Sequence, residues 1–207
     1  MRSQFKTAFA ATMCAAGLAG CATQMNASDA GRIQSIAVTA IAEPHYYYAG
    51  RGANEDFNEP MRSQGLHLGS EMADAIAKEL QQGGYQASAG SLATAPDAKM
   101  EITLGGLLPD QLGPIYARQN EGLEPVFTAK VRLVDSKTGK TLFSQLYEVA
   151  DPPIKPMDGT VLIVPDKKYA MTEESDFAAH PERAAAGFRS AIQPVAKSVA
   201  ASLKKPN

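Results

Sequence analysis

The stretch PVFTAKVRLVDSKTGKTLFSQLYEV, residues 125–149, is the most informative part of the sequence, because it predicts two neighbouring strands and the turn between them. Its first half alternates between an apolar and a polar set: Phe127, Ala129, Val131 and Leu133 against Thr128, Lys130 and Arg132. A period of two is typical of a strand with one buried and one wet face. Residues 135–139 end in glycine and separate the two strand-like runs. The sequence therefore predicts an antiparallel β-hairpin with its turn at Asp135 to Gly139.

The same stretch contains Gly139-Lys140-Thr141, which matches the end of a nucleotide-binding P-loop. The first glycine of that motif should stand at position 134, which is Val134. The motif should also open a helix, whereas the residues that follow are strand-like. We therefore exclude a nucleotide site and interpret SKTGKT as a solvated hairpin turn.

Four further runs outside the hairpin are strand-like. Residues 32–42 alternate Ile36, Val38 and Ala40 with Ala37, Thr39 and Ile41, so both faces are nearly apolar, as in an interior strand. Residues 98–108 set Met100, Ile102 and Leu104 against Lys99, Glu101 and Thr103, which predicts a strand with one wet face. We expect a short strand in YQASAG, residues 85–90, and an edge strand in VLIV, residues 161–164.

Two segments have helical periodicity. The first runs from about Ser63 to Gln82, where apolar residues recur at helical spacing and Gly83-Gly84 follows as a stop. The second runs from Pro181 to about Leu203, with Pro194 inside it, so we expect this helix to be kinked or split.

Between these elements lie polar or proline-rich connections. Residues 43–60 are expected to form a long loop or an irregular strand extension, and residues 109–124 a loop. DPPIKPMDG, residues 151–159, is a rigid connection, and DKKYAMTEESDF, residues 166–177, a polar loop. The order β-α-β-β-β-α predicts an α+β fold, an antiparallel or mixed sheet with two helices packed on one face. We expect residues 33–205 to form one domain.

The first twenty residues have the pattern of a signal peptide. Arg2 and Lys6 precede an uncharged run of apolar and small residues. That run is shorter than the roughly 20 residues that a transmembrane helix needs, and polar sequence follows at once. A buried N-terminal helix is the alternative, but an alanine-rich run without a polar face is a poor amphipathic helix. We therefore expect residues 1–20 to be cleaved.

The end of this segment is more specific than an ordinary cleavage site. Leu18-Ala19-Gly20-Cys21 resembles the lipobox of bacterial lipoproteins, in which an aliphatic residue and two small ones precede a modified cysteine. The resemblance implies that Cys21 receives a diacylglycerol, that cleavage precedes it, and that the freed amine is acylated, for instance with palmitate. Two or three acyl chains anchor a protein stably to a membrane.

The residue after the cysteine bears on the choice of membrane. In lipoproteins of Gram-negative bacteria, an Asp at that position usually holds the protein at the inner membrane, and here it is Ala22. For a Gram-negative source we therefore expect the outer membrane, with the domain on its periplasmic face. Residues 21–32 are small and polar and are interpreted as a lipidated, flexible tether.

Cleavage changes the charge and the cysteine count. The chain has 20 Lys plus Arg and 22 Asp plus Glu; losing Arg2 and Lys6 brings the formal net charge to −4 with His neutral. Cys14 is also lost, so lipidated Cys21 is the one cysteine left. This excludes an intrachain disulfide, a thiol nucleophile and cysteine-ligated metal chemistry. The mildly acidic, mixed charge argues against nucleic acid, which requires a basic stripe.

The most distinctive polar–aromatic cluster is His45-Tyr46-Tyr47-Tyr48, followed by Arg51. Tyrosines can stack on sugar rings or peptide groups while arginine orients the ligand, so a glycan or peptide site is one interpretation. The other, which we favour, is that alternate tyrosines close the edge of the core and the remainder is a solvated loop.

No catalytic pattern is evident. His45, His67 and His180 lie in three different elements, and none belongs to a known metal or nucleophile motif. Glu173, Glu174 and Asp176 form an acidic loop that lacks the calcium-binding spacing. We predict no catalytic residues, no metal and no cofactor; a hydrolase that uses scattered carboxylates is unsupported.

The order of the elements over residues 32–205 resembles that of small α/β domains of envelope lipoproteins, such as the outer-membrane activators of penicillin-binding proteins and the N-terminal domain of the TolB protein. The anchor, combined with a compact α/β domain that lacks site chemistry, favours a non-enzymatic binding or assembly module whose partner is an envelope protein or peptidoglycan. The alternative is a lipoprotein that binds a small molecule, lipid or glycan through the Tyr46–Tyr48 loop.

Overall fold

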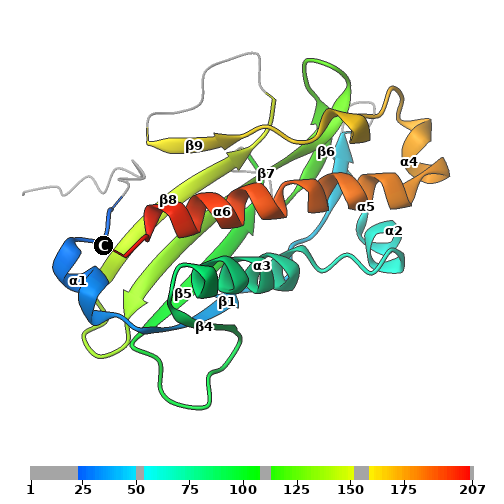
Figure 1. The fold of residues 1–207 in the computed structure, drawn as a ribbon. Coiled ribbons are helices and arrows are strands. Elements are labelled where there is room, and N and C mark those ends of the chain that lie inside the picture. The colour runs from blue at the N-terminus through cyan, green and yellow to red at the C-terminus, as the bar shows by residue number, and fades with distance from the viewer. Residues whose placement is uncertain (1–22, 50–53, 108–112, 152–158, 206–207) are drawn as a thin grey trace, which may run out of the picture.

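The predicted hairpin is confirmed and lies at the centre of a mixed β-sheet (Figure 1). The computed structural model describes residues 23–49, 54–107, 113–151 and 159–205. Within it, β7 (Leu123–Asp135) pairs antiparallel with β8 (Thr141–Val149). Gly139 has φ +70° in the turn, a conformation that glycine adopts without strain.

Seven further strands complete the sheet: β1 (Ser35–Ala40), β2 (Tyr47–Ala49), β3 (Asn54–Asp56), β4 (Gln86–Ala89), β5 (Ala98–Gly105), β6 (Ile115–Arg118) and β9 (Thr160–Ile163). The helices are α1 (Ala27–Arg32), α2 (Asn58–Ser63), α3 (Leu68–Gln82), α4 (Ser175–Ala179), α5 (Pro181–Ser190) and α6 (Ile192–Ser202), with the 3-10 helix η1 (Lys167–Tyr169). The elements that sequence analysis did not anticipate fall mostly in the expected loops at residues 43–60 and 109–124, which contain β2, β3, α2 and β6.

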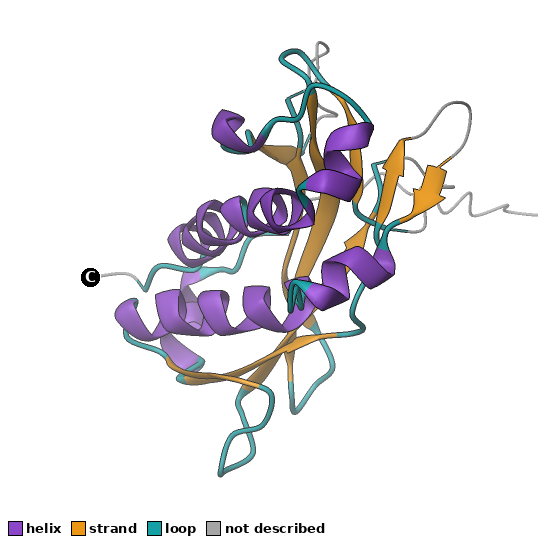
Figure 2. Cartoon of the chain, turned by 90° about the vertical axis from the view of Figure 1, so that its right-hand side faces the viewer, coloured by secondary structure: helices purple, strands orange, loops and turns teal. Residues whose placement is uncertain are grey.

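The sheet runs in the order β3-β2-β6-β7-β5-β1-β4, and β8 joins β7 to β9. β1 is an interior strand, parallel to both β4 and β5, as its apolar faces predicted. β5, β6 and β8 are antiparallel to β7, and β9 is a parallel neighbour of β8. Helices α3, α5 and α6 lie on one side of the sheet, which confirms an α+β fold with helices on one face (Figure 2).

The core lies between the sheet and these helices. The apolar set of β7 is fully buried there: Phe127, Ala129, Val131 and Leu133. Val195 and Val199 of α6 belong to the same cluster, as the helical periodicity predicted. Burying one such large side chain contributes about 1.5–3 kcal/mol, so the period of two in β7 determines which face of the sheet the helices cover.

The first long helix begins later than expected, at Leu68 rather than near Ser63. Gly65 has φ +60°, which separates α2 from α3. The free N–H groups at the start of α3 are instead bound by an upstream loop: the N–H groups of Gly69 and Ser70 donate to the Glu43 carboxylate at 3.0 and 2.8 Å. The helical pattern could not reveal this cap because Glu43 is 26 residues away from Gly69.

The expected split of the C-terminal helix is confirmed, but the break lies at Ala191 rather than at Pro194 itself. Pro194 occupies the first turn of α6, where the N–H that proline lacks is not needed. A continuous helix would require an N–H at residue 194 for the carbonyl of Ser190, so α5 ends there.

The segment expected to be a flexible tether is folded onto the domain from Thr23 onward. The backbone groups of Thr23 and Ser144 exchange two hydrogen bonds of 2.9 and 3.0 Å at the edge of β8. α1 follows, capped by the Asn26 side chain, and Arg32 lies 2.5 Å from Asp135 in the hairpin turn. Charge pairing with the turn therefore orders a segment whose composition alone predicted flexibility. Cys21 and the signal peptide lie outside the described residues.

Asp135 makes the stability of this contact pH-dependent. The N–H of Thr138 donates to the Asp135 carboxylate and Arg32 pairs with it, which lowers the pKa of Asp135 to about 2. A carboxyl whose pKa is lower in the folded state contributes stability above its unfolded pKa of about 4 and loses it as the pH falls through the folded value.

We therefore expect Asp135→Asn to reduce the free energy of unfolding at pH 7 and to flatten its decline between about pH 4 and pH 2. Urea unfolding at a series of pH values measures both effects. Asp74→Asn, at an exposed position of α3, is the control. Parallel acid profiles for wild type and Asp135→Asn would contradict the prediction.

Candidate functional site

The face of the sheet opposite the helices carries a polar surface that we call the open face. It is defined by exposed or half-buried side chains of three neighbouring strands: Thr39 of β1, Lys99, Glu101 and Thr103 of β5, and Lys130 and Arg132 of β7. These are the even positions of β7 and the odd positions of β1 and β5, whose other sets form the core. The pattern that buries one face therefore exposes the other.

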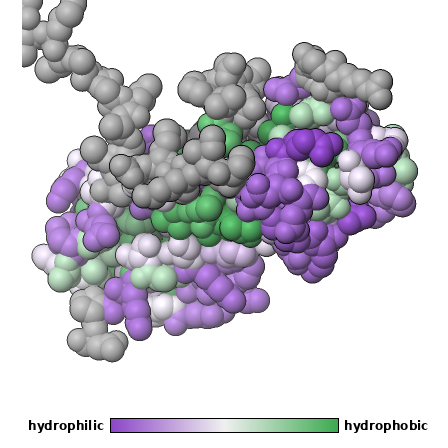
Figure 3. Space-filling model, turned by 90° about the horizontal axis from the view of Figure 1, so that it is seen from above, coloured by the Kyte–Doolittle hydropathy of each residue, from purple (hydrophilic) through white to green (hydrophobic). Residues whose placement is uncertain are grey.

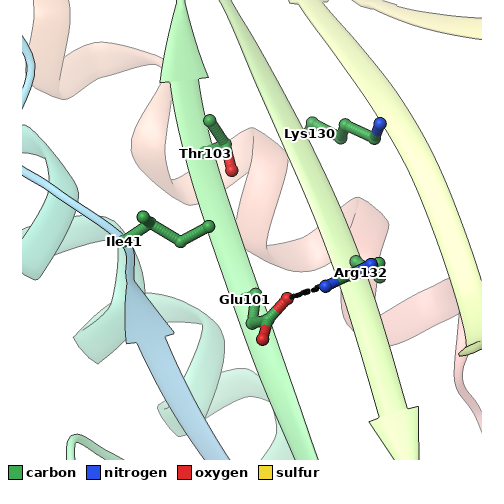
Figure 4. A pocket seen from close by; sticks show the side chains of 5 residues that line it. All are labelled: Ile41, Glu101, Thr103, Lys130 and Arg132. Carbon is green, nitrogen blue, oxygen red and sulfur yellow. Dashed lines mark hydrogen bonds and ion pairs between the residues drawn. The ribbon is translucent and has the colours of Figure 1, made fainter. Parts of the chain in front are cut away.

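The register places these side chains opposite one another. Thr39 lies opposite Glu101, Glu101 opposite Arg132, and Thr103 opposite Lys130. Arg132 donates to one Glu101 oxygen from Nη2 at 2.6 Å and from Nε at 3.0 Å. Figure 4 shows this pair among the residues that line a hollow. The hollow has a volume of about 170 Å³ and is also lined by Ile41, which is 62% exposed.

A larger hollow of about 390 Å³ lies beside the first, over β1 and the start of β5. It is lined by Ala37, Thr39 and Lys99 on the sheet and by residues 90–96 of the β4–β5 connection. Thr39 and Lys99 also belong to the open face, so both hollows lie on this side of the sheet.

The charge of the open face is opposite to that expected for the mature chain. Lys99, Lys130 and Arg132 outnumber Glu101, which gives a formal charge of +2. Glu148 of β8 shares this side of the sheet, but it is only 6% exposed, and burial raises the pKa of its carboxyl. Ammonium and guanidinium groups bind phosphate and carboxylate, and the threonine hydroxyls add hydrogen bonds. This chemistry favours binding of an anionic group.

The tyrosine cluster is divided between the core and an exposed hairpin. Tyr46 is 2% exposed, its hydroxyl oxygen accepts the N–H of Leu68 at 3.2 Å, and burial raises the pKa of its phenol. The Tyr48 ring packs 5.0 Å from Phe177, and its hydroxyl binds Glu55. Two of the three tyrosines therefore have structural roles, as the interpretation that we favoured requires.

His45 and Tyr47 are the accessible part of this cluster. Their rings lie 4.8 Å apart, and His45 Nε2 is 3.1 Å from the Asp56 carboxylate and also contacts Asn58. Arg51 lies outside the described residues. The structure thus brings His45 and Tyr47 together at the β2–β3 hairpin, and ligand binding by His45, Tyr46, Tyr47, Tyr48 and Arg51 stays a prediction.

The other candidate residues lie apart from this cluster. His67 directly precedes α3, and His180 separates α4 from α5, where its Nδ1 is 3.2 Å from Glu182. The Asp176 carboxylate accepts the N–H groups of Glu173 and Thr172, which lower its pKa. It therefore closes the turn before α4. SKTGKT is the hairpin turn, as interpreted from the sequence.

A buried carboxylate forms a second polar cluster. Glu124 of β7 is 1% exposed and lies 3.4 Å from Lys167 Nζ, which also contacts Asp151. Burial raises the pKa of Glu124, the nearby Lys167 opposes this shift, and Asp151 adds to it. The cluster joins the start of β7, the end of β8 and η1, so it fastens three chain segments together.

An apolar strand forms one edge of the sheet. In the described part of the chain β9 pairs with β8 alone, and its residues are all half-buried. Val164, which follows it, is 50% exposed. Seen from above, hydrophobic residues gather over this edge between polar areas (Figure 3). Such an edge favours pairing with another strand, although nothing in the structure identifies one.

Within residues 23–49, 54–107, 113–151 and 159–205, no three His, Cys, Asp or Glu side chains are grouped so that they could hold a metal ion. No helix among the same residues has both the length and the apolar character needed to cross a membrane.

Sequence analysis predicted the strands of the open face but not the site itself. The polar sets of residues 98–108 and 125–149 were recognised as wet faces. Their assembly depends on the pairing of β1 with β5 and of β5 with β7, over separations of about 30 to 60 residues. Excess lysine and arginine on the wet faces of two strands is the signal that could have indicated it.

Comparison with known proteins gives only distant likenesses. No protein-family model matches the chain, and no curated protein sequence matches it. Among solved structures, it is similar to a Xanthomonas campestris protein of family DUF330, with 14% identity and a TM-score of 0.42 over 81% of each chain. It is also similar to PelC of Paraburkholderia phytofirmans, a dodecamer, with 13% identity and a TM-score of 0.40 over 90% of this chain and 96% of that one.

Lipoprotein GNA1162 of Neisseria meningitidis is a third such structure, with 18% identity and a TM-score of 0.35 over 61% of this chain and 88% of that one. All three TM-scores lie below 0.5, so these likenesses carry no argument about the function of this chain.

Proposed function

We propose that the protein is a lipid-anchored cell-envelope protein of the outer membrane that faces the periplasm and serves as a non-enzymatic binding or assembly module. The lipobox-like sequence at Leu18 to Cys21 supports the anchor. The open face supports the binding role, and it is the observation that carries the proposal: a sheet covered by helices on one side presents threonines, cations and two adjoining hollows on the other. The partner is a component of the envelope, for which sequence analysis favours a protein or peptidoglycan.

The anchor is tested by replacing each of the two cysteines. In cells grown with labelled palmitate, we expect the wild type to incorporate label and to sediment with membranes, and Cys21→Ala to lose both properties. Cys14→Ala is the matched control, because Cys14 lies within the expected signal peptide, and this variant should retain both. Label that persists in Cys21→Ala would contradict the lipid attachment site.

The binding role is tested by crosslinking in living cells, followed by affinity purification and mass spectrometry. We expect wild type to enrich an envelope component that the Cys21→Ala variant does not. A crosslinker placed at Thr103 of the open face should capture it more efficiently than one at Asp74 of α3, which faces the opposite side. Equal capture from both positions would contradict the assignment of the surface.

A second candidate function is binding of a small molecule, lipid or glycan. The larger hollow supports it, because its volume of about 390 Å³ is within the range of ligand sites. Native mass spectrometry of the protein purified from cells distinguishes this function. A bound mass would favour it, and a ligand-free mass would count against it.

A further inference from the structure

We propose that the open face docks onto the lipid phosphate groups of the membrane that holds acylated Cys21. This inference rests on the proposed anchor and specifies which envelope component the open face meets first. It depends on three observations: the short chain between Cys21 and the folded domain, the positive charge of the open face, and the balanced charge of the helical face.

The chain between the anchor and the domain is too short to be a tether. Thr23 is bound to Ser144 by two backbone hydrogen bonds, and Cys21 is only two residues earlier. Two extended residues span at most about 7 Å. The lipid attachment point therefore stays within about 7 Å of Thr23.

The open face begins one strand in from the edge of β8, at β7. Ser144 of β8 lies directly opposite Arg132 of β7. Neighbouring strands are about 4.8 Å apart, so Thr23 is two strand spacings, or about 10 Å, from Arg132. Adding the reach of two residues places the lipid attachment point within about 17 Å of the Arg132 backbone. The bilayer surface is thus within reach of the open face.

The composition of the open face suits a layer of lipid headgroups. Lys99 and Lys130 are exposed, Arg132 has a half-exposed side chain, and their charges exceed that of Glu101. Ile41 adds an exposed aliphatic side chain beside them. Cations that bind phosphate beside an apolar group that enters the headgroup boundary are typical of surfaces that lie on a membrane.

The helical side of the molecule is less suited to the same surface. The exposed or half-buried charges of α3, α5 and α6 balance there: Glu71, Asp74, Glu79 and Glu182 against Lys78, Arg183, Arg189 and Lys197. An anionic membrane therefore attracts the open face, with its charge of +2, more strongly than the helical side. Docking by the open face therefore determines an orientation, with the helices directed away from the bilayer.

A proximity measurement on the acylated full-length protein tests this orientation. Because Cys21 is the one cysteine expected in the mature chain and is blocked by lipid, an added cysteine can be labelled uniquely. The fluorophore is placed at Thr103→Cys on the open face or at Asp74→Cys on α3. Each protein is reconstituted into vesicles of phosphatidylethanolamine and phosphatidylglycerol that contain a headgroup-labelled acceptor lipid. We expect strong energy transfer from position 103 and weak transfer from position 74.

Charge variants test whether the lysines of the open face cause the docking. Lys99→Gln with Lys130→Gln should lower the equilibrium constant for docking about 25-fold, since each cation near an anionic membrane contributes a factor of about five. Transfer from position 103 should fall accordingly, and about 1 M salt should have the same effect. Lys78→Gln with Lys197→Gln, on the helical side, changes the net charge equally and should leave the transfer unchanged. Melting curves of both double variants verify that the fold is intact.

The outcomes separate the two proposals. A protein that is not acylated at Cys21 would overturn the anchor and the docking with it. An acylated protein with equal transfer from positions 103 and 74, or with transfer insensitive to the two lysines, would overturn the docking alone. Weak transfer from position 103 in vesicles, together with capture of a protein or of peptidoglycan at that position in cells, would overturn the docking and leave the proposed binding module in place.

Discussion

Gly187→Ala is expected to lower the free energy of unfolding by about 3 kcal/mol, the upper part of the range for overpacked cores. A Cβ at Gly187 of α5 would lie 1.8 Å from the Tyr116 hydroxyl oxygen and 3.0 Å from its ring carbon. Tyr116 cannot retreat, because it is fully buried between Phe177 and Phe188 at 5.4 and 5.1 Å. The helix must therefore move away from β6. Urea unfolding measures the loss, and the melting temperature should fall by roughly 10 °C.

Two controls isolate this clash. Gly31→Ala places the same methyl group on α1, where no atom lies within 4 Å, and should leave stability unchanged or slightly raised. Tyr116→Phe removes a buried hydroxyl that has no hydrogen-bond partner among the described residues, so it should cost nothing alone and should restore part of the loss in Gly187→Ala. Additive effects of the two substitutions would contradict the proposed contact.

Phe177→Ala should lower the free energy of unfolding by about 4 kcal/mol, as is usual for a phenylalanine removed from a core. Phe177 is 1% exposed, and its ring centroid lies 5.0 Å from Tyr48, 5.5 Å from Phe57 and 5.4 Å from Tyr116. It comes from α4, whose five residues are too few to form a stable helix without packing. Its loss should release α4 and the β2–β3 hairpin together.

Unfolding in urea measures the loss in Phe177→Ala, and limited proteolysis shows whether cleavage near α4 becomes faster than elsewhere. Ala178→Gly, on the exposed side of the same helix, tests helix propensity alone and should cost no more than about 1 kcal/mol. If both substitutions have similar effects, the aromatic cluster is not what holds α4.

The elements that the sequence predicts well are those whose pattern is local. β7 and β8 follow from alternation within one stretch, and α6 from apolar residues at helical spacing. The start of α3 could not be predicted, because Gly65 and the distant Glu43 determine it. Phe177 was interpreted as part of a polar loop, since its partners lie in β2, β6 and the residue before α2, far along the chain.

The residues of the candidate sites also differ in whether a local sequence pattern predicts them. The lipobox-like sequence is contiguous and could be recognised directly, although Cys21 lies outside the described residues. The tyrosines were prominent in the sequence, yet Tyr46 and Tyr48 are used in packing and capping. The basic wet faces of two strands could be recognised in the sequence, but the open face that they form could not, because no sequence pattern states which strand lies beside which. Its six side chains come from three strands whose neighbours were unknown before the structure.

The bridge between Thr23 and Ser144 has a mechanical consequence. With Cys21 anchored as proposed, a force that pulls the domain away from the membrane acts on the chain at Thr23. It therefore stretches the two hydrogen bonds between Thr23 and Ser144 first. Behind them, the contact of Arg32 with Asp135 carries the load into the hairpin turn. These bonds can open while the nine-stranded sheet stays intact. Their rupture would release residues 22–32 as about 35 Å of extended chain. The attachment then keeps the domain close to the membrane at rest and becomes longer under tension.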